Sequence, residues 1–278
     1  IGTIAPDLLP GRPVLAVGAF DAVSAAVGAG AVEDGTCGLV SGSWEDVVAP
    51  VGAPPPAAGL AASGFVVGPY PAVAGLGLLG LNPNGGVAVE WARRLARVSW
   101  PRLERELEAR GQPSPVVVVP HVSGSTCPFG DLQRSRGALL GATLATSGVD
   151  LVQAVLEAVA LEFTVMLERL AKGGATPRLV RATGGGTRSR WWMQLKADLA
   201  RAPIEVASAD SGAFAAALLA GVALGTYPSL TDALRSLVRP VARYEPVEER
   251  AARYAERRAL YLELVPELLW RGRRSQIA

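Results

Sequence analysis

Hydrophobic and polar residues alternate along this chain in short blocks, a pattern that predicts strands separated by helices. Apolar runs bounded by Gly, Pro or charged residues predict strands at residues 13–18, 37–40, 45–49, 116–119, 178–182 and 204–207. Helical spacing or small-residue composition predicts helices at residues 22–31, 85–97, 102–110, 213–224, 229–238 and 247–264. Residues 50–59, rich in Ala, Pro and Gly, are predicted to form a loop. The alternation is typical of an α/β domain.

The clearest helix is predicted to follow Asp150, a preferred N-cap residue, and to end at Gly173. Its apolar residues fall on one stripe, which predicts that the helix lies in the core. The stripe consists of Val152, Val155, Leu156, Val159, Phe163, Met166, Leu167 and Leu170.

Composition limits the classes of function. With 278 residues, half of them hydrophobic, the chain can bury a large core as one or two domains. A net charge of +2 without a basic stripe does not imply nucleic-acid binding, and no apolar run reaches membrane-spanning length. Two distant cysteines, Cys37 and Cys127, indicate buried thiols in a reducing cytoplasm. The single histidine, His121, is expected to be structural.

The segment 180–199 carries the strongest sign of chemistry. An apolar run ends in three glycines, Gly184, Gly185 and Gly186, and an amphipathic helix follows. Glycines at such a junction let a phosphate or ribose approach the backbone, while the helix directs free N–H groups toward the anion. By itself the pattern is equally consistent with a glycine-rich turn that only joins the strand to the helix. On the helix, a face containing Trp192 is expected in the core, whereas Lys196 is expected to be solvated.

Two more segments have both a structural and a chemical interpretation. Asp21 stands where a strand turns into a helix, and by spacing alone it is best interpreted as a helix cap. A carboxylate at the mouth of a cleft can also accept the proton of an attacking hydroxyl. The pair Gly42 and Ser43 could form a hairpin turn, or could hold phosphate oxygens through backbone N–H and hydroxyl donors. Gly86 lies in a turn that leads into a helix.

Together these segments resemble, in order, the motifs of the FGGY family of carbohydrate kinases, with xylulokinase-like and fuculokinase-like features. The resemblance covers the GlyAlaPheAsp element ending at Asp21, the SerGlySerTrpGlu element, the turn at Gly86 and the triple glycine with Ser189. It departs from the family at Ala22, where Asn or Gln is common, and at residues 125–126, where Ser and Thr replace Glu and Arg.

The resemblance implies the fold and the activity. It implies a ribonuclease-H-like (actin-like ATPase) lobe with a mixed sheet flanked by helices, comprising residues 1–278 with a lead-in at 1–12 and a tail at 266–278. The sugar-binding N-terminal lobe is expected to be absent, because the chain begins at Ile1 without an AspXaaGlyThr loop. The implied reaction transfers the γ-phosphoryl group of ATP, with Mg²⁺, to a hydroxyl of a ketose or polyol. The isolated lobe is expected to be inactive, and a homodimer is one expected assembly.

The same resemblance assigns the site residues. Asp21 is implied as the general base, and Gly42, Ser43 and Gly86 as contacts near the phosphates and the nucleotide. Gly185 and Gly186 are implied to lie against adenosine, with Ser189 near the base. Metal ligands are expected mainly in the absent lobe.

Two other functions stay open from the sequence. One is a nucleotide-binding remnant or regulatory pseudokinase, which the departures at residues 22, 125 and 126 favour. The other is a dinucleotide-binding oxidoreductase, although residues 184–189 lack the GlyXaaGlyXaaXaaGly spacing.

Overall fold

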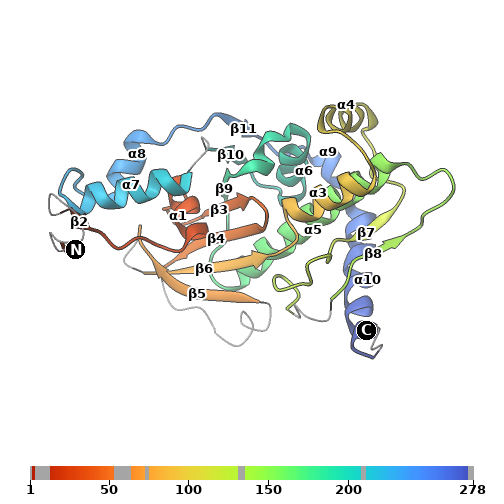
Figure 1. Ribbon diagram of the computed structural model, residues 1–278, viewed down its shortest axis with the longest axis horizontal. Coiled ribbons are helices and arrows are strands. Elements are labelled where there is room, and N and C mark those ends of the chain that lie inside the picture. The colour runs from red at the N-terminus through yellow and green to blue at the C-terminus, as the bar shows by residue number, and fades with distance from the viewer. Residues whose placement is uncertain are drawn as a thin grey trace.

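The computed structural model describes residues 2–3, 13–52, 64–72, 75–130, 135–207 and 211–274 (Figure 1). Within these residues the largest sheet has seven strands in the order β11-β10-β9-β3-β4-β6-β5. They are β3 (Thr36–Ser41), β4 (Glu45–Val51), β5 (Phe65–Tyr70), β6 (Gly75–Asn82), β9 (Leu179–Thr183), β10 (Ile204–Val206) and β11 (Ala242–Tyr244). The neighbours β3, β9 and β10 run parallel, and the other pairs are antiparallel. The predicted mixed sheet is therefore confirmed.

The remaining elements surround this sheet. Two small antiparallel sheets pair β1 (Gly2–Thr3) with β2 (Val14–Leu15) and β7 (Val117–Val119) with β8 (Ala138–Leu140). The helices are α1 (Asp21–Gly28), α3 (Gly86–Leu95), α4 (Trp100–Arg110), α5 (Gly148–Lys172), α6 (Arg190–Ala200), α7 (Ser211–Ala223), α8 (Leu230–Leu237), α9 (Glu248–Arg253) and α10 (Ala255–Arg274), with a 3₁₀ turn η1 (Gly185–Arg188). Among the described residues, no helix combines the length and apolar character needed to cross a bilayer.

The sheet separates two hydrophobic cores, because successive side chains of a strand point to opposite faces. On β4, Val47 and Ala49 pack with α5 and α6, whereas Val48 packs with α1, α7 and α8. Figure 1 shows these two groups of helices on either side of the central strands. Positions 45–51 are all buried, which explains why this strand reads as an almost continuous apolar run.

Helix α5 confirms the predicted central helix but begins two residues before Asp150. Ser147 is the N-cap, and its hydroxyl accepts from the Asp150 N–H while the Asp150 carboxylate accepts from the Ser147 N–H at 2.7 Å. The predicted role of Asp150 as N-cap is thus wrong. Asp150 occupies the third helical position of a capping box, where its carboxylate satisfies the backbone N–H of the N-cap residue.

Helices α1 and α7 pack closely because both consist of small residues. A Cβ on Gly28 would overlap the carbonyl oxygen of Ser211 and lie 2.7 Å from its carbon. The Ser211 hydroxyl also shares a hydrogen bond of 2.9 Å with Thr183, at the end of β9. This contact fastens α7 to the sheet beside the three glycines.

The structure corrects two predicted elements near the chain ends. The predicted buried strand at residues 13–18 is only β2, and both of its residues are exposed. The predicted helix at 247–264 is divided at Tyr254 into α9 and α10, and α10 continues to Arg274. Most of the predicted tail at 266–278 is therefore helical up to residue 274, and residues 275–278 lie outside the described part. The predicted lead-in at 1–12 is described only at β1, and residues 53–59 of the predicted loop are also outside it.

Candidate functional site

The turn between β3 and β4 is joined to the start of α3 by backbone hydrogen bonds. The Gly86 N–H donates to the Gly42 carbonyl at 2.9 Å, and the Val87 N–H donates to the Ser43 carbonyl at 3.0 Å. A Cβ on Gly86 would lie 2.6 Å from the Gly42 oxygen, so only glycine allows this approach. The segment around Gly42 and Ser43 is a hairpin turn, in which the Gly42 N–H also donates to the Trp44 carbonyl at 2.9 Å and Ser43 is exposed.

The three glycines form a loop between β9 and α6, directly beside that turn. Gly184 has φ +97°, and a Cβ there would lie 2.5 Å from the Ser41 carbonyl oxygen. Gly185 faces open space, whereas a Cβ on Gly186 would overlap the Ser41 hydroxyl. Ser189 is the N-cap of α6, and its hydroxyl oxygen accepts from the Trp192 N–H at 3.2 Å. The fold therefore requires glycine at positions 184 and 186, whereas position 185 has room for a side chain.

These segments border one cavity of about 910 Å³. It brings together Gly42, Ser43, Gly86, Gly185, Gly186 and Ser189, the six residues predicted as nucleotide contacts. The rest of its lining comes from Val87, Val89, Glu90, Trp91, Arg94, Leu95, Trp100, Glu104, Arg188 and Trp192. Segments that are far apart in the sequence, at residues 42–43, 86 and 185–189, thus border the same space.

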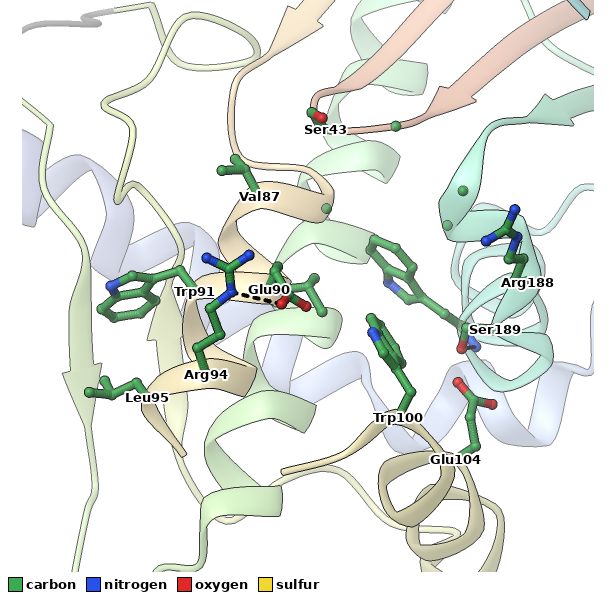
Figure 2. Close-up of a pocket in the computed structure, with 16 residues that line it drawn as sticks. Ser43, Val87, Glu90, Trp91, Arg94, Leu95, Trp100, Glu104, Arg188 and Ser189 are labelled. Atoms are coloured by element: carbon green, nitrogen blue, oxygen red, sulfur yellow. Dashed lines mark hydrogen bonds and ion pairs between the residues drawn. The ribbon is translucent and has the colours of Figure 1, made fainter. Parts of the chain in front are cut away.

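Helices α3 and α4 supply a wall that the sequence analysis missed. Figure 2 shows Trp91 and Leu95 on α3, and Trp100 and Glu104 on α4, with Glu104 directed toward Ser189. Burial raises the pKa of the Glu104 carboxyl, and the nearby Ser189 hydroxyl opposes that effect. By its i, i+3, i+7 spacing Trp100 shares a stripe with the buried Leu103 and Leu107, so the local pattern predicts a core position and gives no signal of a cavity wall.

Glu90 on the same wall holds two arginines. Its carboxylate pairs with Arg93 at 2.7 Å and with Arg94 at 2.8 Å, and these guanidinium groups lower the Glu90 pKa to about 2. Figure 2 shows the pair with Arg94 at the cavity rim. Arg188, at the end of η1, lines the cavity opposite this cluster. Two guanidinium groups, Arg94 and Arg188, and two carboxylates, Glu90 and Glu104, therefore line the cavity.

Beneath the two glycine turns lies Lys196, and the prediction that it is solvated is wrong. Its side chain is fully buried, and its ammonium forms an ion pair with Glu45 and a hydrogen bond of 3.2 Å to the Ser41 hydroxyl. The ammonium also lies 3.5 Å from the centre of the Trp192 ring. Burial lowers the Lys196 pKa, and the charge of Glu45 opposes that effect. The predicted burial of Trp192 is confirmed.

Asp21 does not line this cavity. It is the first residue of α1, on the opposite face of the sheet, and the N-cap position belongs to Phe20, so the capping interpretation is wrong in detail. Its exposed carboxylate accepts from the Ala22 N–H at 2.8 Å. The Asp21 carboxylate repels the negative charge of Asp46, which lies three residues after Ser43 in the sequence. The pKa of Asp46 rises to about 7, mainly through burial and further through the charges of Glu45 and Asp21.

The remaining predicted motif, at residues 120–131, does not reach the cavity in its described part. His121 is buried, with one ring nitrogen 2.7 Å from Glu162 and the other bonded to Ser135, in agreement with a structural role. Cys37 and Cys127 are buried free thiols, as predicted, and burial raises the Cys37 pKa to about 12. Among the described residues, no three His, Cys, Asp or Glu side chains are placed to hold a metal ion.

Known proteins give an independent assessment. Residues 49–224 match the C-terminal domain of the FGGY family of carbohydrate kinases. A glycerol kinase of Allorhizobium ampelinum is 34% identical over 174 residues, which cover 60% of this chain and 35% of that protein. A glycerol kinase of Lactobacillus delbrueckii is 30% identical over 172 residues, covering 60% of this chain and 34% of that protein. The chain therefore spans about a third of the length of these relatives.

Solved structures give the same assignment for the fold. A xyloylose kinase from Brucella ovis superposes with a TM-score of 0.81 at 27% identity, covering 90% of this chain and 52% of that one. A gluconate kinase from Lactobacillus acidophilus has a TM-score of 0.77 at 26% identity, covering 91% and 51%. The expected actin-like ATPase fold is thereby confirmed. The matched region contains Gly86, α3, α4 and the glycine loop with α6, although not the Gly42–Ser43 turn, and the chain therefore belongs to the FGGY family of carbohydrate kinases.

Proposed function

We propose that this chain is the nucleotide-binding lobe of an ATP-dependent carbohydrate kinase, which phosphorylates a hydroxyl of a ketose or polyol. The observation that carries the proposal is the meeting of the Gly42–Ser43 turn, Gly86 and the Gly185–Gly186 loop around one cavity. A purine nucleotide needs such a space, with bare backbone on one side and aromatic side chains on the other. An N-terminal lobe would complete the enzyme and supply most contacts to the sugar.

In this proposal the adenosine lies against Gly185 and Gly186, and the phosphates extend toward Gly42 and Ser43. The open space at Gly185 suits that placement. The Ser189 hydroxyl already caps α6, so it acts by shaping the wall. Arg188 and Arg94 offset the charge of the phosphates from opposite sides.

The residues of this lobe fit Mg²⁺ only when the ion binds together with ATP. Mg²⁺ is usually held by one or two carboxylates together with substrate phosphates and water, so a cluster of three protein ligands is not required. When bound, the ion would neutralise charge on the transferred phosphoryl group. Asp21 is the proposed general base, which accepts the proton of the sugar hydroxyl when the lobes close. Its place near the end of β3, outside the nucleotide cavity, leaves its carboxylate exposed to a second lobe.

Two measurements test the proposal. Tryptophan fluorescence of this chain, with Trp91, Trp100 and Trp192 in the cavity, should respond to ATP and be unaffected by NAD. A preference for NAD would support the oxidoreductase and contradict the kinase. ADP release with a panel of ketoses and polyols, in a protein that joins this chain to an N-terminal lobe of the family, tests turnover. ATP binding without ADP release from any acceptor would indicate a regulatory nucleotide-binding protein.

The role of Asp21 has its own test in the same joined protein. Asp21→Asn should lower turnover by roughly 10²- to 10⁴-fold, the usual contribution of a general base. ATP binding should stay at the parent level, because Asp21 does not line the cavity. Parent-level turnover in the variant would exclude Asp21 as the base.

A further inference from the structure

Lys196 is unusual because a lysine is rarely fully buried. Three groups surround its ammonium: the Glu45 carboxylate, the Ser41 hydroxyl at 3.2 Å and the Trp192 ring at 3.5 Å. The Ser41 hydroxyl donates in turn to the other oxygen of Glu45 at 2.8 Å. We name Ser41, Glu45, Trp192 and Lys196 the buried latch. None of its three polar members, Ser41, Glu45 and Lys196, lines the cavity.

The buried latch connects the two glycine turns of the nucleotide cavity. Ser41 and Glu45 flank the Gly42–Ser43 turn at the ends of β3 and β4, whereas Trp192 and Lys196 lie on α6. The Ser41 side chain occupies the space that a Cβ on Gly186 would need, and Trp192 lies 2.9 Å from that same position. A shift of α6 relative to the turn would therefore break the latch and open this contact.

We propose that Lys196 and Glu45 are positioning residues, which hold the Gly42–Ser43 turn and the Gly185–Gly186 loop at the separation that lets one nucleotide contact both. The inference rests on the proposed nucleotide site. It goes beyond that proposal because it assigns the spacing of the site to a buried ion pair that touches no ligand.

The energetics of buried charge explain why such a pair can act on position more than on stability. Removing two charges from water is costly, and apolar residues of similar size often give equal or greater stability. An ion pair with hydrogen bonds has one preferred geometry, whereas apolar side chains tolerate sliding. Replacing both charged residues together should therefore keep the chain folded while it removes the fixed geometry between the turn and the loop.

A comparison of two ligands tests the proposal. ATP must contact both turns at once, whereas adenosine contacts only the loop at Gly185 and Gly186. In the double variant Glu45→Leu with Lys196→Met, ATP should bind at least about tenfold more weakly, since misalignment removes the benefit of a preorganised site. Adenosine should bind as it does to the parent chain. The matched control is Arg181→Met, which breaks the partly buried pair of Arg181 with Glu205 between β9 and β10, outside the cavity.

The outcomes separate this inference from the proposed function. Equal affinity of variant and parent for ATP, or equal losses for ATP and adenosine, would overturn the positioning role. Failure of the parent chain to bind either ligand would overturn the nucleotide site itself, and the inference with it. If the double variant does not fold, Ser41→Ala keeps the ion pair but removes its hydroxyl link to the turn. That variant should weaken ATP binding alone, and an unchanged ratio of ATP to adenosine affinity would refute the proposal.

Discussion

The loop at Gly184 and Gly185 provides a test in which two adjacent glycines should respond oppositely to alanine. At Gly184 the backbone has φ +97°, and a Cβ would lie 2.5 Å from the Ser41 carbonyl oxygen and 2.8 Å from its carbon. At Gly185 a Cβ would meet nothing within 4 Å. Gly184→Ala should therefore destabilise the folded chain, whereas Gly185→Ala should only reduce the space available to a ligand in the cavity.

The magnitudes follow from the two environments. The backbone of Gly184, with φ +97° and ψ 175°, lies in a region that essentially only glycine occupies, and it costs an alanine about 1–3 kcal/mol. Moving β3 away from the new methyl group adds about 1–3 kcal/mol, as for other overpacked sites. In a chain of this size 1 kcal/mol shifts the melting temperature by about 2 °C, so the sum lowers it by roughly 4–12 °C. Gly185→Ala should change stability by less than about 1 kcal/mol, because the alanine also restricts the unfolded chain.

Thermal melts by circular dichroism and ATP titrations by tryptophan fluorescence measure both effects. Gly185→Ala should melt like the parent chain but bind ATP about tenfold more weakly, a loss of about 1.4 kcal/mol. A Gly184→Ala variant that melts within 2 °C of the parent would refute the close contact with Ser41. Parent-level ATP affinity in Gly185→Ala would mean that adenosine does not lie against this glycine.

Three further predictions concern folding. Gly28→Ala should lower the melting temperature, because its Cβ would overlap the Ser211 carbonyl. Gly18→Ala is the control and should not lower it in this way, because a Cβ there meets open space. Equal melting temperatures of the two variants would contradict the α1–α7 packing. Asp46, with a pKa of about 7, keeps a proton that the unfolded chain loses above about pH 4, so its contribution to stability should fall by up to about 1.4 kcal/mol per pH unit between pH 4 and 7. Asp46→Asn should flatten that fall in urea denaturation at pH 5 and 8, and an unchanged slope would exclude Asp46 as its source. Ser147→Ala should cost about 1 kcal/mol in denaturant unfolding by removing the α5 cap, and a change under 0.3 kcal/mol would rule out this role.

Some features of this protein were determined by the sequence alone. The apolar stripe from Val152 to Leu170 predicted the burial of α5, since a 3.6-residue period reports which face of a helix meets a core. The glycines at 184–186 predicted a loop where backbone is approached closely, and the order of motifs predicted the family. The stripe and the glycines are local signals, and the order of motifs is a property of the sequence that can be compared with a known family.

Other features were decided only by the tertiary structure. Strands β5 and β6 were not predicted, because glycines interrupt their apolar residues, although Gly77 is required by the Tyr70 ring, which would lie 2.6 Å from a Cβ. The wall made by Trp100 and Glu104, and the place of Asp21 outside the cavity, depend on how helices cross the sheet. The burial of Lys196 depends on Glu45, which lies 151 residues away. A lone charge predicts exposure, because the free energy of burying it is set by a partner that no local pattern can specify.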